Sequence, residues 1–417
     1  KATAISGAGA AGQYAIDSTL LGGLYANRIS LISTEQGVGV RMAGDAAASA
    51  ADFTLSAAGD IQLNNKINAK QAIDIQNSSA QQQKLNIQGG LTANNISIGA
   101  ANTQNLNVDV AGGTLYAGSA LDIQSQAFNA NNAKIQAKDT LKVNVNTDIA
   151  LQNTVLDPAD LQVKSNAFTA QDSQLKSAQN ITIQTAQDLK LKNTDAEVQN
   201  NVILSSVSGN MELAGGKLKA GNALDLKANH LALSAQTSAT NTNIQAQQFT
   251  LDENGLIVSL NNTEVNASNA DVWGQMYSSA ANFNIGGMLN SANKTLVSIQ
   301  NLNTVNAKDL SLKGLWEAGN LTLTAVNSLQ QAGAIYAQNN LVLQANAMSL
   351  TGAVQAGHKL NVNAVQQLTV DSQAQLFSSD SIELSADAIQ LDGYAGAENS
   401  MTAIAANNLT AGTTAQL

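Results

Sequence analysis

The chain of 417 residues has no cysteine, a single proline, and few aromatic or charged side chains. Without cysteine it can form neither a disulfide framework nor a thiolate metal site. This absence also suits a chain exported unfolded through an oxidising compartment, where thiols can pair wrongly. The lone proline, Pro158, and the 31 glycines argue against Pro-rich spacers and flexible linkers.

Positive charge is also scarce. There are 20 Lys and Arg against 30 Asp and Glu, a formal net charge of −10, and the two arginines, Arg28 and Arg41, both lie near the start. Binding to a phosphate backbone needs a basic face, so nucleic acid is excluded as a partner. The chain also lacks an uninterrupted apolar run of about 18 residues, so we expect no membrane-spanning helix.

The remaining composition describes an aliphatic core with a polar, uncharged surface. Hydrophobic residues make up 44% of the chain, yet only 3% is aromatic and 12% is charged. Such a hydrophobic content excludes a disordered chain. The core must be built from Leu, Ile, Val and Ala, and the surface mostly from Asn, Gln, Ser and Thr.

An internal repeat organises the chain. Segments that begin at Leu121, Leu141, Leu161 and Ile181 align with one another, each 20 residues after the last. Every segment contains three short apolar clusters that alternate with period two, which is typical of strands. Asn, Asp, Ser, Gln and Gly separate the clusters and favour turns.

A unit of three short strands cannot bury its own inner face and must stack on copies of itself. We therefore predict an all-β fold, a single-stranded parallel β-helix (solenoid) with about 20-residue coils. Residues 1–250 and 317–417 are predicted to form regular repeats. Residues 251–316, where the apolar positions leave the 20-residue frame, are predicted to form less regular coils or a loop elaboration.

Three aromatic residues are candidates for surface contact: Trp273, Tyr277 and Trp316. An exposed aromatic side chain on an aromatic-poor surface can anchor a sugar or a protein partner. The alternative is that a tryptophan fills the wider interior of an irregular coil. Tyr336 and Tyr394 are further, lesser candidates.

No motif predicts a catalytic, cofactor or metal site, and we expect no enzyme and no cofactor. The Gly-Val-Gly at 37–39 lacks the strand and helix of a phosphate-binding loop. His230 and His358 are isolated from other ligands. A polysaccharide-degrading enzyme is a minor alternative, because parallel β-helices host such enzymes, but its clustered carboxylates are not apparent.

Residues 14–44, YAIDSTLLGGLYANRISLISTEQGVGVRMAG, carry the most specific pattern in the chain. They resemble a marker of the filamentous haemagglutinin family of two-partner secretion exoproteins, found near the start of the first haemagglutinin repeat region. The resemblance is strongest to contact-dependent growth inhibition exoproteins. Met42 departs from it, since asparagine is common there, and residues 47–63 continue the match.

Within this segment the glycines are expected to form corners, and Glu35 is expected to pair with Arg41 across a corner. Four aliphatic residues are predicted to point inward: Ile29, Leu31, Val38 and Val40.

The resemblance implies a secreted, right-handed parallel β-helix that acts as an extracellular stalk at the outer-membrane surface of a Gram-negative bacterium. In growth-inhibition members such a stalk presents a receptor-binding region and a toxin to neighbouring bacteria; in haemagglutinins it is an adhesin linked to virulence. The implied partners are an outer-membrane two-partner secretion transporter and a target-cell receptor or glycan. The transporter acts through an N-terminal secretion domain that is expected to precede this piece, which we expect to be monomeric.

Overall fold

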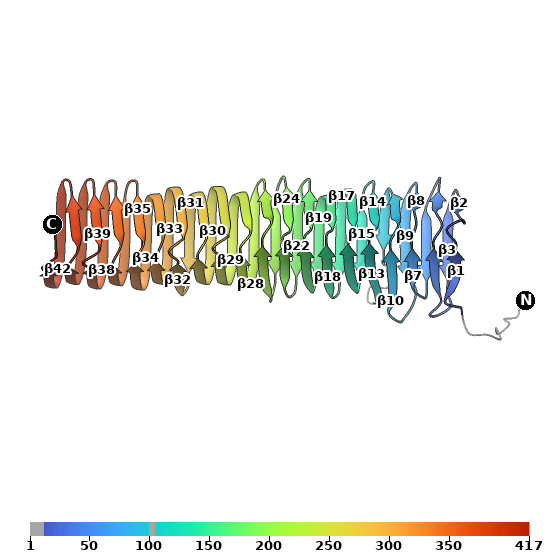
Figure 1. Ribbon diagram of the computed structural model, residues 1–417, viewed down its shortest axis with the longest axis horizontal. Coiled ribbons are helices and arrows are strands. Elements are labelled where there is room, and N and C mark those ends of the chain that lie inside the picture. The colour runs from blue at the N-terminus through green and yellow to red at the C-terminus, as the bar shows by residue number, and fades with distance from the viewer. Residues whose placement is uncertain (1–11, 100–104, 417) are drawn as a thin grey trace, which may run out of the picture. The chain divides into compact units, whose positions relative to one another are not determined.

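The fold is that of a β-solenoid. The computed structural model describes residues 12–99 and 105–416, in two units, residues 1–199 and 200–417. Among the described residues there is no α-helix, and parallel strands stack in about 20 coils. In each unit the strands of successive coils run side by side, from blue to green in the first and from green to red in the second (Figure 1). The predicted all-β solenoid is therefore confirmed.

The described residues of the first unit form 24 strands, most of them short. Their bounds are β1 (Tyr14–Ser18), β2 (Leu24–Ala26), β3 (Ile29–Ser33), β4 (Gly39–Met42), β5 (Ala46–Ala48), β6 (Phe53–Ala57), β7 (Ile61–Leu63), β8 (Ile67–Ala69), β9 (Ala72–Asn77), β10 (Gln83–Ile87), β11 (Gly90–Ala93), β12 (Asn95–Ile98), β13 (Leu106–Ala111), β14 (Thr114–Ala117), β15 (Leu121–Ser125), β16 (Ala127–Asn131), β17 (Lys134–Val145), β18 (Asp148–Gln152), β19 (Val155–Ser165), β20 (Ala167–Gln171), β21 (Gln174–Ser177), β22 (Asn180–Thr185), β23 (Leu189–Lys192) and β24 (Asp195–Val198).

In the second unit several strands are long enough to continue around a corner. Their bounds are β25 (Val202–Ser206), β26 (Asn210–Ala214), β27 (Lys217–Ala220), β28 (Ala223–Leu233), β29 (Gln236–Leu251), β30 (Leu256–Val272), β31 (Gln275–Ile285), β32 (Met288–Ser291), β33 (Leu296–Leu312), β34 (Leu315–Gln331), β35 (Ala334–Ala337), β36 (Leu341–Leu350), β37 (Ala353–Ala356), β38 (Lys359–Val370), β39 (Gln375–Ser378), β40 (Ser381–Leu391), β41 (Tyr394–Ala397) and β42 (Ser400–Ala411).

The sequence repeat corresponds to one coil. Leu121 pairs with Leu141, Leu141 with Leu161, and Leu161 with Ile181, all in parallel register. All four side chains are buried, and buried positions alternate with more exposed ones along these strands. Each coil thus places its aliphatic residues on top of those of the preceding coil, so that only the stack closes the core.

One corner of the first unit is built by asparagine and aspartate in a left-handed backbone conformation. Asn132, Asn153, Asp172 and Asn193 occupy this corner in four successive coils, with φ angles between 47° and 52°. Asn and Asp tolerate positive φ better than other residues with a side chain. The polar residues between the apolar clusters therefore satisfy the backbone geometry that the corner requires.

A buried hydroxyl follows this corner residue and ties neighbouring coils together. Thr154 Oγ1 lies 3.0 Å from the carbonyl oxygen of Ala130 and 2.9 Å from that of Gln152. Thr194 repeats the arrangement two coils later. The hydroxyl group of each side chain thus lies within hydrogen-bonding distance of a carbonyl of its own coil and of a carbonyl in the preceding coil.

Residues 251–316, for which less regular coils or a loop elaboration are predicted, lie in the parallel ladder. The coils there continue the parallel ladder without a loop elaboration: Leu256 pairs with Gln275, Gln275 with Leu296, and Leu296 with Leu315. The steps along the sequence are 19, 21 and 19 residues, so small changes in coil length move the apolar positions out of a fixed 20-residue frame. Longer coils occur instead in the part predicted to be regular, where Ile73 pairs with Ile96 and Ile96 with Leu121, 23 and 25 residues on.

These length changes fall at corners. In the second unit the register between neighbouring coils shifts at two recurring corners, for example between Ser278 and Ala280 at one and between Asn363 and Gln367 at the other. Shifting a strand by one residue would turn its whole inner face outward. Because the extra residue is taken up at the corner, the strands on either side keep their inward residues.

Replacing Asn153 tests the conformational role of the corner. Alanine in the left-handed region costs about 1–2 kcal/mol, so we expect Asn153→Ala to lower the free energy of unfolding by about 1 kcal/mol. Asn153→Gly should have a smaller effect, because glycine adopts positive φ freely. Urea unfolding of the purified chain measures both. Asn144→Ala, within strand β17, is the matched control, and equal losses for Asn153→Ala and Asn153→Gly would contradict the assignment.

Candidate functional site

The opening segment forms an ion pair between neighbouring coils. Asp17 of β1 pairs in register with Arg41 of β4, and the guanidinium Nε and Nη2 atoms lie 2.9 and 2.6 Å from the carboxylate oxygens of Asp17. The guanidinium carbon also lies 4.9 Å from the ring centroid of Tyr14. The hydrogen bond from Arg41 lowers the pKa of Asp17, and the same bond raises the pKa of Arg41.

The predicted partner of Arg41 was wrong. Glu35 lies exposed in the turn between β3 and β4, whereas the parallel register places Asp17 directly beside Arg41. Side chains one coil apart in the ladder are nearer than those across a corner of the same coil. Of the inward residues predicted here, Ile29, Val38 and Val40 are buried and Leu31 is half-buried.

Trp316, one of the three aromatic candidates, belongs to the core. It is fully buried on β34, and its ring lies 5.8 Å from that of Phe283, tilted by 57°. Its indole Nε1 donates a hydrogen bond of 3.1 Å to Ser291 Oγ. The expected surface position is therefore wrong for Trp316. Trp316 instead fills the interior of its coil, which was the alternative prediction. A hydrogen-bond partner for its indole N–H lies inside the coil, as a buried tryptophan usually requires.

The other two candidates lie at the surface of the same coil. Trp273 and Tyr277 are each 37% exposed. Trp273 occupies the corner between β30 and β31, where its backbone N–H donates to the carbonyl of Leu251. Tyr277 points outward from β31, and its hydroxyl donates a 3.3 Å hydrogen bond to Gln275 Oε1. The structure thus places these two at the surface and separates them from the buried Trp316.

Sequence reasoning missed Phe377. It lies half-buried at an outward position of β39, in the position within its coil that Tyr277 holds in β31 and Tyr336 holds in β35. The pairings from Tyr277 to Ser298, Glu317 and Tyr336 carry this position from coil to coil. Phe377 could be recognised from its place in the coil, which it shares with Tyr277 and Tyr336. That correspondence can be seen in the sequence only when the variable coil lengths are known.

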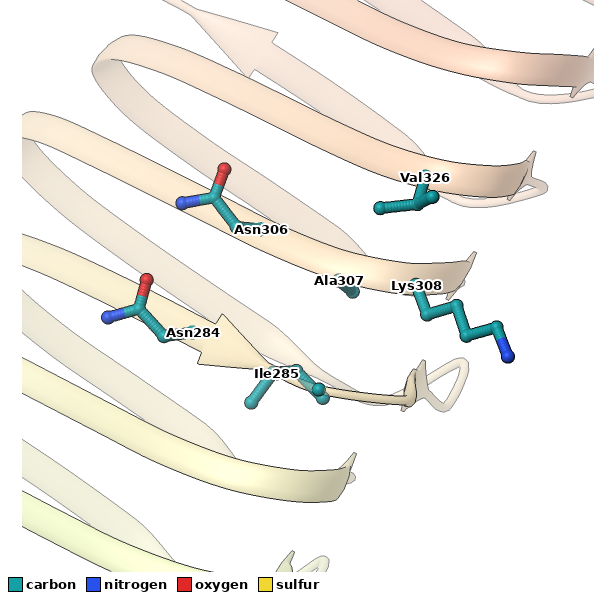
Figure 2. A pocket seen from close by; sticks show the side chains of 7 residues that line it. Asn284, Ile285, Asn306, Ala307, Lys308 and Val326 are labelled. Carbon is teal, nitrogen blue, oxygen red and sulfur yellow. The ribbon is translucent and has the colours of Figure 1, made fainter.

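A separate open hollow lies along a corner of the second unit. Its volume is about 580 Å³, and it is lined by Asn284, Ile285, Gly286, Asn306, Ala307, Lys308 and Val326. Figure 2 shows Asn284 and Asn306 pointing the same way from successive coils, while Lys308 extends away from them. The lining includes one charged side chain and no carboxylate, so it offers no acid–base pair for catalysis.

Ionisable residues do not converge elsewhere in the part of the chain that the structure describes. Over residues 12–99 and 105–416, no three His, Asp or Glu side chains group closely enough to hold a metal ion. Asp309 accepts a 2.6 Å hydrogen bond from the hydroxyl group of Ser328 in the next coil. Within the same residues, no helix has the length and apolar character needed to cross a membrane.

The two tryptophans provide a matched pair of substitutions. Trp316→Ala removes a fully buried ring and should lower the free energy of unfolding by about 3–5 kcal/mol. Trp273→Ala removes a partly exposed ring and should cost less than about 1 kcal/mol. Urea unfolding followed by circular dichroism measures both, and similar losses for the two variants would show that the assignment of core and surface is wrong.

Comparison with known proteins finds similarity over part of the chain. A 68-residue stretch, 16% of this chain, is 53% identical to the tRNA nuclease CdiA-2 of Burkholderia pseudomallei, of which it covers 2%. A stretch of 65 residues is 46% identical to the 16S rRNA endonuclease CdiA of Enterobacter cloacae, again 16% of this chain and 2% of that protein. A longer stretch of 153 residues, 36% of this chain, is 33% identical to the tRNA nuclease CdiA of Yersinia mollaretii, of which it covers 5%.

No family model matches the chain, and no solved structure matches it significantly. The aligned part spans only about 2–5% of the length of these relatives. Together with the β-solenoid fold, the matches confirm the resemblance first carried by residues 14–44. Over part of its length, this chain is homologous to the CdiA proteins of contact-dependent growth inhibition.

Proposed function

We propose that this chain is an extracellular stalk segment of a secreted, haemagglutinin-like exoprotein of the contact-dependent growth inhibition type. The observation that supports it is the combination of CdiA similarity with a continuous ladder of parallel coils in each unit. The segment would hold receptor-binding and toxin modules of the parent exoprotein away from the producing cell.

The physical basis of this role is the stiffness of a stacked ladder. Each coil makes main-chain hydrogen bonds to the coil before and after it, and each adds about 4.8 Å along the stack. The buried aliphatic column runs through the same stack, so bending would open the ladder and the core together. The length of the stack therefore increases with the number of residues, whichever side chains lie on its outer surface.

The proposed setting follows from the same similarity. The exoprotein would be secreted through an outer-membrane two-partner secretion transporter and would remain at the outer-membrane surface of a Gram-negative bacterium. It would act as a monomer and meet a receptor or glycan on the target cell. The nuclease activities in the names of the relatives belong to those much longer proteins. We propose no enzymatic role for this segment.

A second candidate function is adhesion by the segment itself. Trp273 and Tyr277 favour it, because both expose aromatic surface on a chain that is only 3% aromatic. Aromatic side chains with a polar tip are enriched in contact surfaces. In this role the stalk would bind a host or bacterial surface directly, besides carrying other modules.

Deletion of whole coils tests the stalk function. Removing residues 121–180 from the exoprotein places Ile181 after Ala120, in the register that Leu121 holds against Ile96. We expect the shortened exoprotein, shorter by on the order of 15 Å, to be displayed and to inhibit neighbours in co-culture. The control deletion of residues 121–170 breaks the register and should abolish display. Loss of inhibition by a displayed in-register variant would contradict a purely spacing role.

Attachment to target cells tests the adhesive function. The double variant Trp273→Ala and Tyr277→Ala should reduce attachment of the purified, fluorescently labelled chain to target bacteria by about tenfold or more. Thr324→Ala, a substitution at an outward position of another face, is the control. Unchanged attachment of the folded double variant would leave the segment with the stalk function alone.

A further inference from the structure

The outer surface of the second unit differs sharply between its faces. One face, which we call the aromatic face, consists of the outward positions of residues 256–259, 275–278, 296–299 and 315–318 and of β35, β37, β39 and β41. These segments pair with one another coil by coil. The next face along each coil has polar outward residues instead, such as Asn306, Thr324 and Asn363.

The corresponding segments of the first unit provide an internal comparison. Strands β14, β21 and β24 and the starts of β17 and β19 hold the same place in the coil, just before the next Leu-x-Ile type cluster. Five of their ten outward positions are charged, and Tyr116 of β14 is the one aromatic residue among them. The charged residues are Lys134, Asp157, Lys176, Asp195 and Glu197. The backbone geometry therefore permits charged residues at these outward positions. The scarcity of charge on the aromatic face does not follow from the fold.

On the aromatic face, Glu317 is the one charged residue among the outward positions from Leu256 to Gly396. Four of the chain's few aromatic residues occupy outward positions there: Tyr277, Tyr336, Phe377 and Tyr394. A concentration of apolar surface with a single charged residue indicates a contact surface and not a solvated one.

The aromatic side chains are spaced along the stack and not clustered. From Tyr277 the ladder passes through Ser298 and Glu317 to Tyr336, a distance of three coils or roughly 14 Å. Phe377 follows two coils later, roughly 10 Å further on. A ligand that touched all of them would have to be extended and lie parallel to the stack.

Tyr394 lies flat on the sheet. Its ring covers Gly396, the next outward residue of β41, where an added Cβ atom would overlap both the ring and its hydroxyl group. Tyr394 is nevertheless 40% exposed, so one face of the ring remains open. Glycine at position 396 thus permits an aromatic platform that any other residue would lift away from the surface.

Hydrogen-bonding side chains lie between these rings. Gln275 accepts from the Tyr277 hydroxyl, Glu317 Oε1 accepts from Ser298 Oγ at 2.5 Å, and the Gln355 and Gln375 amides are exposed. Amides and a carboxylate offer donors and acceptors at the edges of the rings. This alternation of flat apolar faces with polar groups, of which only Glu317 is charged, matches a sugar chain, whose rings have apolar C–H faces and a rim of hydroxyl groups.

We infer that the aromatic face binds a neutral glycan chain that runs along the stack, with its sugar rings on Tyr277, Tyr336, Phe377 and Tyr394. The net charge of −10 disfavours an anionic polysaccharide, and it also makes two copies of the chain repel each other. The inference deepens the adhesive function proposed above and rests on it. Attachment to cells tests adhesion, whereas binding to purified glycans tests the ligand class, so the two can fail separately.

The test measures retention of the purified chain on soluble neutral polysaccharides, namely a β-glucan, an α-glucan, a mannan and a galactan, with hyaluronan and polygalacturonate as anionic probes. We expect retention on at least one neutral probe. Replacing the four aromatic residues by alanine should weaken it about tenfold or more. Gly396→Ala alone should weaken it as well, because the new Cβ displaces Tyr394. The matched control replaces four outward residues of the neighbouring face by alanine: Thr324, Gln344, Asn361 and Asn363.

Several results would overturn the inference. They are failure to bind any neutral probe, preference for an anionic probe, and equal retention of wild type and the aromatic variant. A dimer in sedimentation velocity that the aromatic variant loses would show instead that the face joins two copies. Circular dichroism verifies the fold of each variant. If the fourfold variant does not fold, the single variants Tyr394→Ala and Gly396→Ala are tested in its place.

Discussion

Within each unit, successive coils are hydrogen-bonded to one another along their length, and this ladder determines the rest of the structure. Main-chain pairing fixes which residues lie above one another, and the alternation along each strand then decides which of them point inward. Leu121, Leu141 and Leu161 form one such column. The ladder also explains the pair of Asp17 and Arg41, which are distant in sequence but adjacent in the stack.

The same constraint divides the residues into those that the fold dictates and those that it leaves free. Inward positions must be aliphatic, small or, as with Trp316, supplied with an internal hydrogen-bond partner. Corners need residues that accept unusual backbone angles, as Asn153 does. Outward strand positions have neither requirement, so charge, amides or aromatic rings can occupy them. Recognition by such a molecule is therefore most readily found in the composition of its faces, since deep pockets do not arise from the winding itself.

The repeat and its strand pattern were sufficient to predict the fold class, because stacking on identical neighbours is how units of this size bury an apolar face. The site was less accessible. Trp316 and Trp273 look alike in the sequence, and their different environments follow from their positions in the coil. Residues 251–316 appeared irregular only because a fixed period of 20 was applied to coils of 19 and 21 residues. Phe377 could not be aligned with Tyr277 for the same reason.

The corners at which the register shifts, as between Asn363 and Gln367, have a consequence for how such a chain can diverge. A one-residue insertion there is absorbed by local backbone and leaves the parity of the following strand intact. At these corners of the coils, insertions and deletions are thus tolerated nearly as well as substitutions. Homologues can drift out of alignment while conserving every layer of their interior, and sequence comparison of such proteins loses signal long before their architecture changes.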